Sequence, residues 1–186
     1  GPEQNLADAR KLAALFRAIA ECATPTLARV HGAALGGGMG LAAACDICIA
    51  ADRASFATSE VRFGLIPSAI GPYVVRAIGE RQAYRYFQTA ERIDAARARE
   101  LGLAHEVATV DELDATLQRV LDALATGGPQ SQRAATELIR AVANRPIDDA
   151  VVEDTARRIA SLRATDEARE GLAAFLDKRP AAWTLG

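Results

Sequence analysis

Hydrophobic residues recur at helical spacing in the first part of the chain. Between Asn5 and Cys22 the apolar residues fall largely on one face of a helix: Leu6, Leu12, Leu15, Phe16 and Ile19. This pattern predicts an amphipathic helix, and Pro25 would end it. The short apolar run 26–30 that follows predicts a buried strand.

Further along, the pattern changes from mixed strands and helices to helices alone. Strands are predicted at 46–50, 55–57 and 105–107, and helices at 41–45, 67–78, 80–89 and 95–101. From residue 110 on, the pattern predicts helices at 110–125, 129–144, 148–162 and 165–177, separated by glycine and proline residues. We therefore predict an α/β domain over residues 1–107 and an all-helical region over residues 108–186.

Composition and charge exclude several classes of function. Half of the 186 residues are hydrophobic and the formal net charge is −2, so the chain can build a sizeable core and has no basic surface for nucleic acid. No apolar run approaches the length of a membrane span, and no leader pattern is present. Three cysteines are too few for a disulfide framework or a zinc site. We expect a cytoplasmic protein that binds no metal, nucleic acid or membrane.

The most distinctive stretch is the glycine-rich segment 31–40, which reads His-Gly-Ala-Ala-Leu-Gly-Gly-Gly-Met-Gly. A strand, a turn of three glycines and the start of a helix would aim backbone N–H groups at a ligand. Such a turn can hold a phosphate or the oxyanion of a thioester enolate. The segment lacks the Lys-Ser/Thr of a P-loop and the spacing of a dinucleotide site. A turn that only packs a helix on a strand is the alternative.

The motifs around this segment resemble the crotonase superfamily, the enoyl-CoA hydratases and isomerases. They are Val-His-Gly-Ala-Ala-Leu-Gly-Gly-Gly at 30–38, Ala-Cys-Asp-Ile at 44–47, Phe-Ala-Thr-Ser-Glu-Val-Arg-Phe-Gly-Leu-Ile-Pro at 56–67, and Phe-Leu-Asp-Lys-Arg at 175–179. The resemblance implies an α/β fold with a partial crotonase-like ββα spiral core, followed by an all-helical C-terminal region. In the superfamily, several strands and a helix normally precede this stretch, so we expect a longer native polypeptide.

The resemblance places catalysis at two residues. The backbone N–H of Gly37 would be one of two donors to the thioester oxygen of an acyl-CoA, where negative charge accumulates in the transition state. The second donor would lie in the missing N-terminal portion. Glu60 would move a proton at the acyl chain, and its apolar neighbours Val61 and Phe63 would desolvate its charged form. A packing glycine and a surface glutamate are the alternatives.

The resemblance also indicates which residues bind the substrate. The thioester and acyl chain would be flanked by Ala34, Leu35, Gly36, Gly38 and Pro67. Phe175 and Lys178 resemble a C-terminal pair that meets the adenine and phosphates of coenzyme A, often from a neighbouring subunit. No cofactor is implied, because the coenzyme A thioester is itself the substrate. The implied assembly is a homotrimer or a dimer of trimers, and the resemblance makes the helical region 108–186 the part that mediates trimerisation.

One position departs from the pattern of many enoyl-CoA hydratases. They carry a second glutamate two residues after the third glycine, where this chain has Gly40. Details of the segments 36–41, 59–61, 64–67 and 72–74 instead resemble the methylglutaconyl-CoA hydratase-like branch. That branch would imply a branched, carboxylated enoyl-CoA from leucine or terpene breakdown. Arg62 and Arg76 are then candidate cations for its carboxylate, and each could equally be a solvated surface charge.

We predict an enoyl-CoA hydratase, a carbon–oxygen lyase that adds water to a 2-enoyl-CoA. An enoyl-CoA isomerase is the nearest alternative, because a single glutamate suffices to carry a proton between two carbons. A noncatalytic acyl-CoA-binding protein that has lost a carboxylate at Gly40 is the alternative from another class. His31 and His105 have no nucleophile to pair with, and we expect both to be structural.

Overall fold

The computed structural model describes residues 1–184, which divide into two compact units. The first unit comprises residues 1–22 and 26–118, and the second comprises 23–25 and the chain from 119 on. Helix α6 (Leu113–Ala125) runs through the division. The predicted domains 1–107 and 108–186 stay a prediction.

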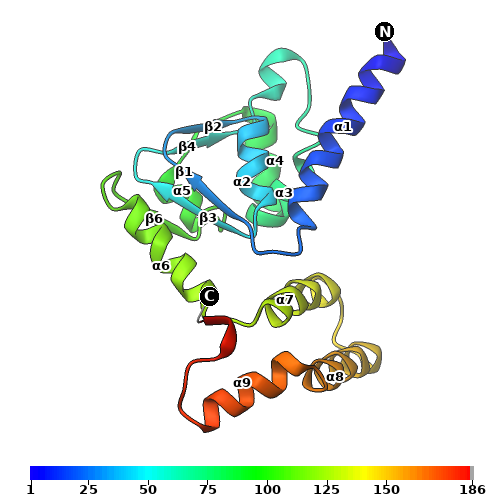
Figure 1. Ribbon diagram of the computed structural model, residues 1–186. Coiled ribbons are helices and arrows are strands. Elements are labelled where there is room, and N and C mark those ends of the chain that lie inside the picture. The colour runs from blue at the N-terminus through cyan, green and yellow to red at the C-terminus, as the bar shows by residue number, and fades with distance from the viewer. Residues whose placement is uncertain (185–186) are drawn as a thin grey trace. The chain divides into compact units, whose positions relative to one another are not determined.

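Two three-stranded sheets form the centre of the first unit (Figure 1). The six strands are β1 (Leu27–Val30), β2 (Ala33–Leu35), β3 (Ile47–Ala51), β4 (Ser55–Ala57), β5 (Ile93–Asp94) and β6 (Glu106–Ala108). One sheet has the order β1-β3-β6 and is parallel throughout. In the other, of order β2-β4-β5, β2 and β4 are parallel and β5 is antiparallel to β4. The first four strands alternate between the sheets, and helical segments follow each pair, which is the ββα order predicted.

Helices cover the sheets and enclose the core of the first unit. They are α1 (Pro2–Ala20), α2 (Gly37–Ala44), the 3₁₀ helix η1 (Glu60–Phe63), α3 (Gly71–Ile78), α4 (Glu80–Thr89) and α5 (Ala95–Glu100). Helix α2 packs against α1, α3 and β2. The buried side chains Phe16 of α1, Met39 of α2 and Val74 of α3 belong to one apolar cluster. Burial of α2 among these elements fixes the position of its N-terminus.

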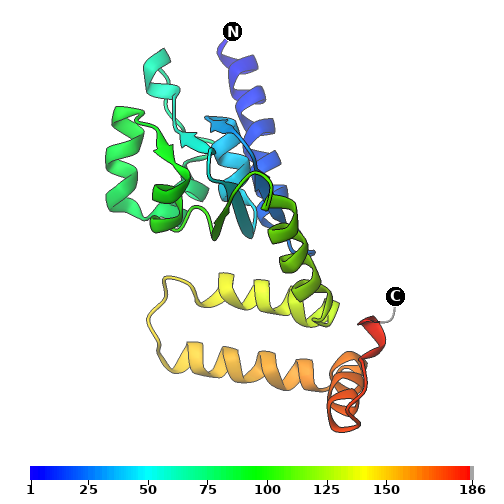
Figure 2. The same cartoon turned by 90° about the vertical axis from the view of Figure 1, so that its left-hand side faces the viewer.

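The second unit is helical. After the end of α6 it contains α7 (Pro129–Val142), α8 (Asp149–Arg163), α9 (Asp166–Leu176) and the 3₁₀ helix η2 (Ala182–Thr184). Helices α7 and α8 lie side by side and run antiparallel, and α9 contacts both (Figure 2). Asp148 caps α8 by accepting a hydrogen bond from Val151 N, and Thr165 caps α9 by accepting one from Ala168 N.

The predicted elements differ from the structure mainly around the glycines and near residue 67. The glycine-rich segment, predicted as a turn, contains the strand β2, and α2 already begins at Gly37. The helix predicted at 67–78 begins only at Gly71, because residues 60–63 form a separate 3₁₀ helix followed by an irregular segment. Strand β5, of two residues, was not predicted. Among residues 1–184, no helix combines the length and apolar character needed to cross a membrane.

Candidate active site

The carboxyl group of Glu60 lies against the backbone just before α2. A Cβ atom on Gly36 would lie 3.1 Å from Glu60 Oε1 and 3.7 Å from its Cδ. Gly36 also has a φ of 51°, in a region that residues with side chains rarely adopt. Glycine is therefore required at position 36, and the Glu60 carboxyl occupies the space that a side chain there would take. The structure thus brings two of the predicted site residues together.

The other carboxyl oxygen of Glu60 is buried without a hydrogen-bond partner. Oε2 is the only buried side-chain nitrogen or oxygen within residues 1–184 that lacks one. Leaving a buried polar group unpaired costs about 1–3 kcal/mol, so such atoms are rare in folded proteins, and a bound water or ligand is the usual partner. The geometry leaves this oxygen available to a ligand.

Backbone donors lie next to this carboxyl, at the N-terminus of α2. Gly36 N donates to Ala57 O at 2.8 Å, and Gly40 N donates to Gly36 O at 3.1 Å. Between them, the N–H groups of Gly37 and Gly38 have no acceptor among the described residues. Unpaired N–H groups and the positive end of the helix dipole both favour a negative charge here. A Cβ on Gly37 would meet nothing within 4 Å, so the space beside it is open.

One turn further along α2, the helix is covered by apolar side chains. A Cβ on Gly40 would lie 2.8 Å from Ile70 Cβ, closer still to Ile70 Cγ2, and 3.0 Å from Phe16 Cε1. Ile70 is 2% exposed, so its side chain is enclosed by the core of the first unit. No side chain fits at position 40 unless Ile70 moves, so a second glutamate has no space there. This part of α2 is lined by hydrocarbon.

The segment that follows Glu60 is apolar and exposed. Phe63, Leu65 and Ile66 are large exposed hydrophobic residues, whereas Pro67 is buried. Arg62, one candidate cation for a carboxylated substrate, donates from Nη2 to Ala90 O at 2.9 Å.

Three of the other predicted binding residues lie near the start of α2. Ala34 is buried in β2, Leu35 is exposed at its end, and a Cβ on Gly38 would lie 3.8 Å from Ala34 Cβ. Ala34 and Gly38 help to line a cavity of about 390 Å³ between residues 28–34 and α2. Glu60 is not among its lining residues.

The two histidines differ in their contacts. His31 is exposed and lines the cavity, and its carbonyl oxygen accepts a hydrogen bond from Arg53 Nε at 3.0 Å. His105 Nδ1 accepts from Cys48 N at 3.1 Å, and His105 N donates to Cys48 O. His105 therefore joins β6 to β3, in the structural role that was predicted.

The predicted contacts to coenzyme A belong to the second unit. Phe175 is 80% exposed near the end of α9. Lys178 lies just past that helix with a φ of 53°, and its N–H donates to Phe175 O at 3.3 Å. Their role in binding coenzyme A stays a prediction.

Comparison with known proteins decides the family. A family model described as enoyl-CoA hydratase/isomerase matches residues 2–185. The chain belongs to the enoyl-CoA hydratase/isomerase family. The crotonase resemblance and the crotonase-like fold predicted from the sequence are thereby confirmed.

Individual members of the enoyl-CoA hydratase/isomerase family are similar over nearly the whole chain. A crystal structure of an enoyl-CoA hydratase from Shewanella pealeana superposes with a TM-score of 0.93 at 46% identity, over 97% of this chain and 68% of that chain. Pseudomonas aeruginosa AtuE has the same TM-score at 35% identity, over 99% of this chain and 71% of that one. A Mycobacterium leprae relative whose name includes enoyl-CoA hydratase echA8 is 37% identical over 170 residues, which are 89% of this chain and 65% of the relative. The chain thus spans about two thirds of the length of these relatives.

Two residues that shape the candidate site were not identified from the sequence. Ile70 fills the space beside Gly40, and no sequence pattern signals that contact. Thr58 is fully buried two residues before Glu60 and donates to Tyr86 O. Its place inside the motif 56–67 is the one signal that could have indicated it.

Proposed function

We propose that this protein is an enoyl-CoA hydratase that adds water to a 2-enoyl-CoA. The observation that carries the proposal is the Glu60 carboxyl, which has a buried, unpartnered Oε2 and lies against Gly36, just before the unpaired N–H groups that begin α2. Membership of the family and the hydratase names of its relatives support it. Because the chain spans about two thirds of the relatives' length, the activity of the whole protein is part of the proposal.

The proposed chemistry assigns one task to each group. In hydration, the oxygen of water bonds to C3 of the acyl chain, C2 receives a proton, and negative charge develops on the thioester oxygen. The Gly37 N–H would donate to that oxygen, where a fixed donor at a helix N-terminus contributes most in the transition state. Glu60 would accept a proton from the water and deliver it to C2, so the carboxyl ends in the state in which it began.

An enoyl-CoA isomerase is the second candidate, and the contact between Ile70 and position 40 favours it. Shifting a double bond requires removing a proton from one carbon and returning it to another, which Glu60 can do alone. Hydration also requires an ordered water, and the hydrocarbon of Ile70 and Phe16 offers it no hydrogen bond on that side. A noncatalytic acyl-CoA-binding protein would use the N–H groups but would have no use for the carboxyl.

The finer parts of the proposal concern the acyl group, coenzyme A and assembly. A branched, carboxylated acyl group such as methylglutaconyl would need a cation, and Arg76, exposed on α3, is the candidate that stays available. Phe175 and Lys178 would bind the adenine and phosphates of coenzyme A. The second unit exposes several large apolar side chains that a trimer or a dimer of trimers would cover: Ile139, Ile147, Val152, Leu172 and Leu176. The proposed location is cytoplasmic.

Turnover of defined thioesters tests the proposal. Crotonyl-CoA, 3-methylglutaconyl-CoA and a 3-enoyl-CoA would each be incubated with the protein and with Glu60→Gln, following the enoyl thioester absorbance. We expect hydration of a 2-enoyl-CoA and a loss of about 100-fold or more in kcat for Glu60→Gln. Glu80→Gln, which removes an exposed carboxyl at the start of α4, serves as the control. Conversion of the 3-enoyl-CoA alone would show that the protein is an isomerase and not a hydratase. Equal binding of the thioesters by the parent protein and Glu60→Gln, with no turnover by either, would show a noncatalytic acyl-CoA-binding protein.

A further inference from the structure

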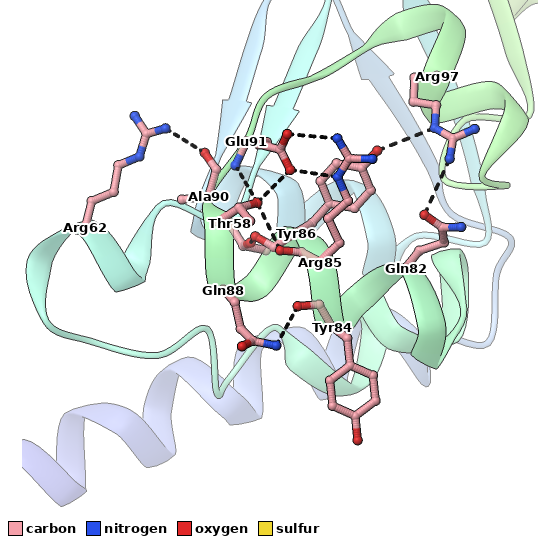
Figure 3. Close-up of polar contacts among 11 residues, drawn as sticks. Thr58, Arg62, Gln82, Tyr84, Arg85, Tyr86, Gln88, Ala90, Glu91 and Arg97 are labelled. Carbon is pink, nitrogen blue, oxygen red and sulfur yellow. Dashed lines mark hydrogen bonds and ion pairs between the residues drawn. The ribbon is translucent and has the colours of Figure 1, made fainter.

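Two side chains on either side of Glu60 bind the last turn of α4 (Figure 3). Thr58 Oγ1 donates to Tyr86 O at 2.9 Å, and Arg62 Nη2 donates to Ala90 O at 2.9 Å. Thr58 lies two residues before Glu60 and Arg62 two residues after it. The short segment that carries the carboxyl is therefore attached to one helix at both of its ends.

The two acceptors are backbone carbonyl groups at the C-terminal end of α4, and Ala90 O is the one that the helix leaves without an N–H partner. Helix α4 ends at Thr89, and Ala90 follows in a left-handed conformation with a φ of 50°. The last carbonyls of a helix have no N–H partner within it, and the negative end of the helix dipole favours a guanidinium. Arg62 meets both conditions at Ala90 O. Tyr86 O accepts hydrogen bonds from both Ala90 N and Thr58 Oγ1, so both lone pairs of this carbonyl oxygen are used.

The carboxyl group itself is held by no hydrogen bond. Within residues 1–184 no group donates to either side-chain oxygen of Glu60, although Oε2 is buried. Its backbone, in contrast, is well fixed, because Leu65 N donates to Glu60 O at 3.1 Å and Thr58 and Arg62 hold the flanks. A carboxylate oriented by donors to its own oxygens would have fewer lone pairs left for a reacting proton.

We propose that Thr58 and Arg62 are positioning residues that orient Glu60 through its backbone and so keep its carboxyl oxygens free for water and substrate. The inference rests on the proposed function, since it takes Glu60 as the group that moves the proton. It also gives Arg62 a role in holding the loop instead of binding a substrate carboxylate.

Steady-state kinetics of matched variants test this inference. In Arg62→Gln and Thr58→Val, we expect kcat to fall about 10- to 100-fold with KM changed less than about twofold, because a misplacement of about 1 Å costs on the order of 100-fold. Thr58→Ser keeps the hydroxyl and should restore kcat. In the Glu60→Gln background the same two substitutions should change the residual rate less than about twofold, because groups that act through one residue are not additive.

Arg85→Gln is the control for these variants. Arg85 lies on the same turn of α4, but within residues 1–184 its guanidinium donates to Glu91 and not to the segment 58–62 (Figure 3). Its kcat should equal that of the parent protein. Equal losses of kcat in the parent and Glu60→Gln backgrounds, or full activity of Arg62→Gln, would overturn the inference.

A second readout separates this inference from the proposed function. A crystal structure of Arg62→Gln should show the Glu60 carboxyl displaced from Gly36, whether or not any thioester is turned over. An unmoved carboxyl would overturn the positioning role, whereas an inactive parent protein with a displaced carboxyl would overturn only the hydratase assignment. If Thr58→Val does not fold, Arg62→Gln alone carries the test, since the Arg62 side chain is on the surface.

Discussion

Replacing Gly40 by alanine should destabilise the protein, even though alanine favours helix more than glycine does. In α2 the change in helix propensity alone would stabilise the fold by up to about 1 kcal/mol. The added methyl, however, would lie 2.8 Å from Ile70 Cβ and closer still to Ile70 Cγ2. Carbon atoms in contact are separated by about 3.5 Å, so Ile70 or the helix has to shift by about 1 Å or more.

The magnitude follows from the packing around Ile70. It is 2% exposed and is the N-cap residue of α3, so the overlap is relieved only by moving that helix or by an unfavourable rotamer. Overpacking of this kind costs about 1–3 kcal/mol, and we expect Gly40→Ala to lower the free energy of unfolding by about 2 kcal/mol. Ile70→Ala alone should cost about 2–5 kcal/mol. In the double variant the new methyl occupies space that Ile70 has left, so the loss should be smaller than the sum by about 0.5–3 kcal/mol.

Urea denaturation followed by far-UV circular dichroism measures these differences. Gly38→Ala is the matched control, because its methyl would lie 3.8 Å from Ala34 Cβ in an ordinary contact, and it should cause no loss of stability. Gly40→Ala as stable as Gly38→Ala would refute the reasoning. So would strict additivity of Gly40→Ala and Ile70→Ala, since Ile70 would then not be what excludes a side chain.

Three further predictions concern pH, thiol reactivity and capping. The hydrogen bond from Arg179 lowers the pKa of Glu170 to about 2, so the ion pair stabilises the fold above about pH 4.5 and this stabilisation is lost as the pH falls toward 2. In Glu170→Gln, the urea midpoint should therefore decrease less between pH 4.5 and 2 than it does in the parent protein. Burial raises the pKa of the Cys48 thiol to about 12, so iodoacetamide at about pH 8 should label the half-buried Cys22 in the native protein and leave Cys48 unmodified by mass spectrometry. Asp148→Ala removes the N-cap of α8 and should cost about 1 kcal/mol in urea, whereas Asp148→Asn keeps a capping oxygen and should retain most of the stability.

Local patterns were sufficient to predict most elements of the fold. Strand β4 at 55–57 and helix α4 at 80–89 have the predicted bounds, because each is delimited by clear changes in residue type. Strand β2 was missed, because its three residues are followed directly by the glycines. Its pairing with β4 is what makes this segment a strand. Such pairing depends on residues about twenty positions away, which periodicity does not report.

The candidate site was predictable only in part, for a similar reason. The motifs indicated Gly36, Gly37 and Glu60 separately. The contact between Glu60 Oε1 and Gly36 depends on how β4 and η1 return to the start of α2. The sequence showed a missing carboxylate at Gly40 without showing that Ile70 fills its place. Contacts between segments far apart in the chain have no local signature.

The unpartnered oxygen of Glu60 links ligand occupancy to the thermodynamics of the fold. A folded chain that keeps Oε2 buried and unpaired is less stable than one with an inert residue there, so the carboxyl lowers the free energy of unfolding. A bound molecule that donates a hydrogen bond to Oε2 restores the lost stability. It binds only the folded chain, because the site does not exist in the unfolded one. Binding and folding are therefore coupled through a single atom, because a ligand that pairs with Oε2 stabilises the folded chain alone.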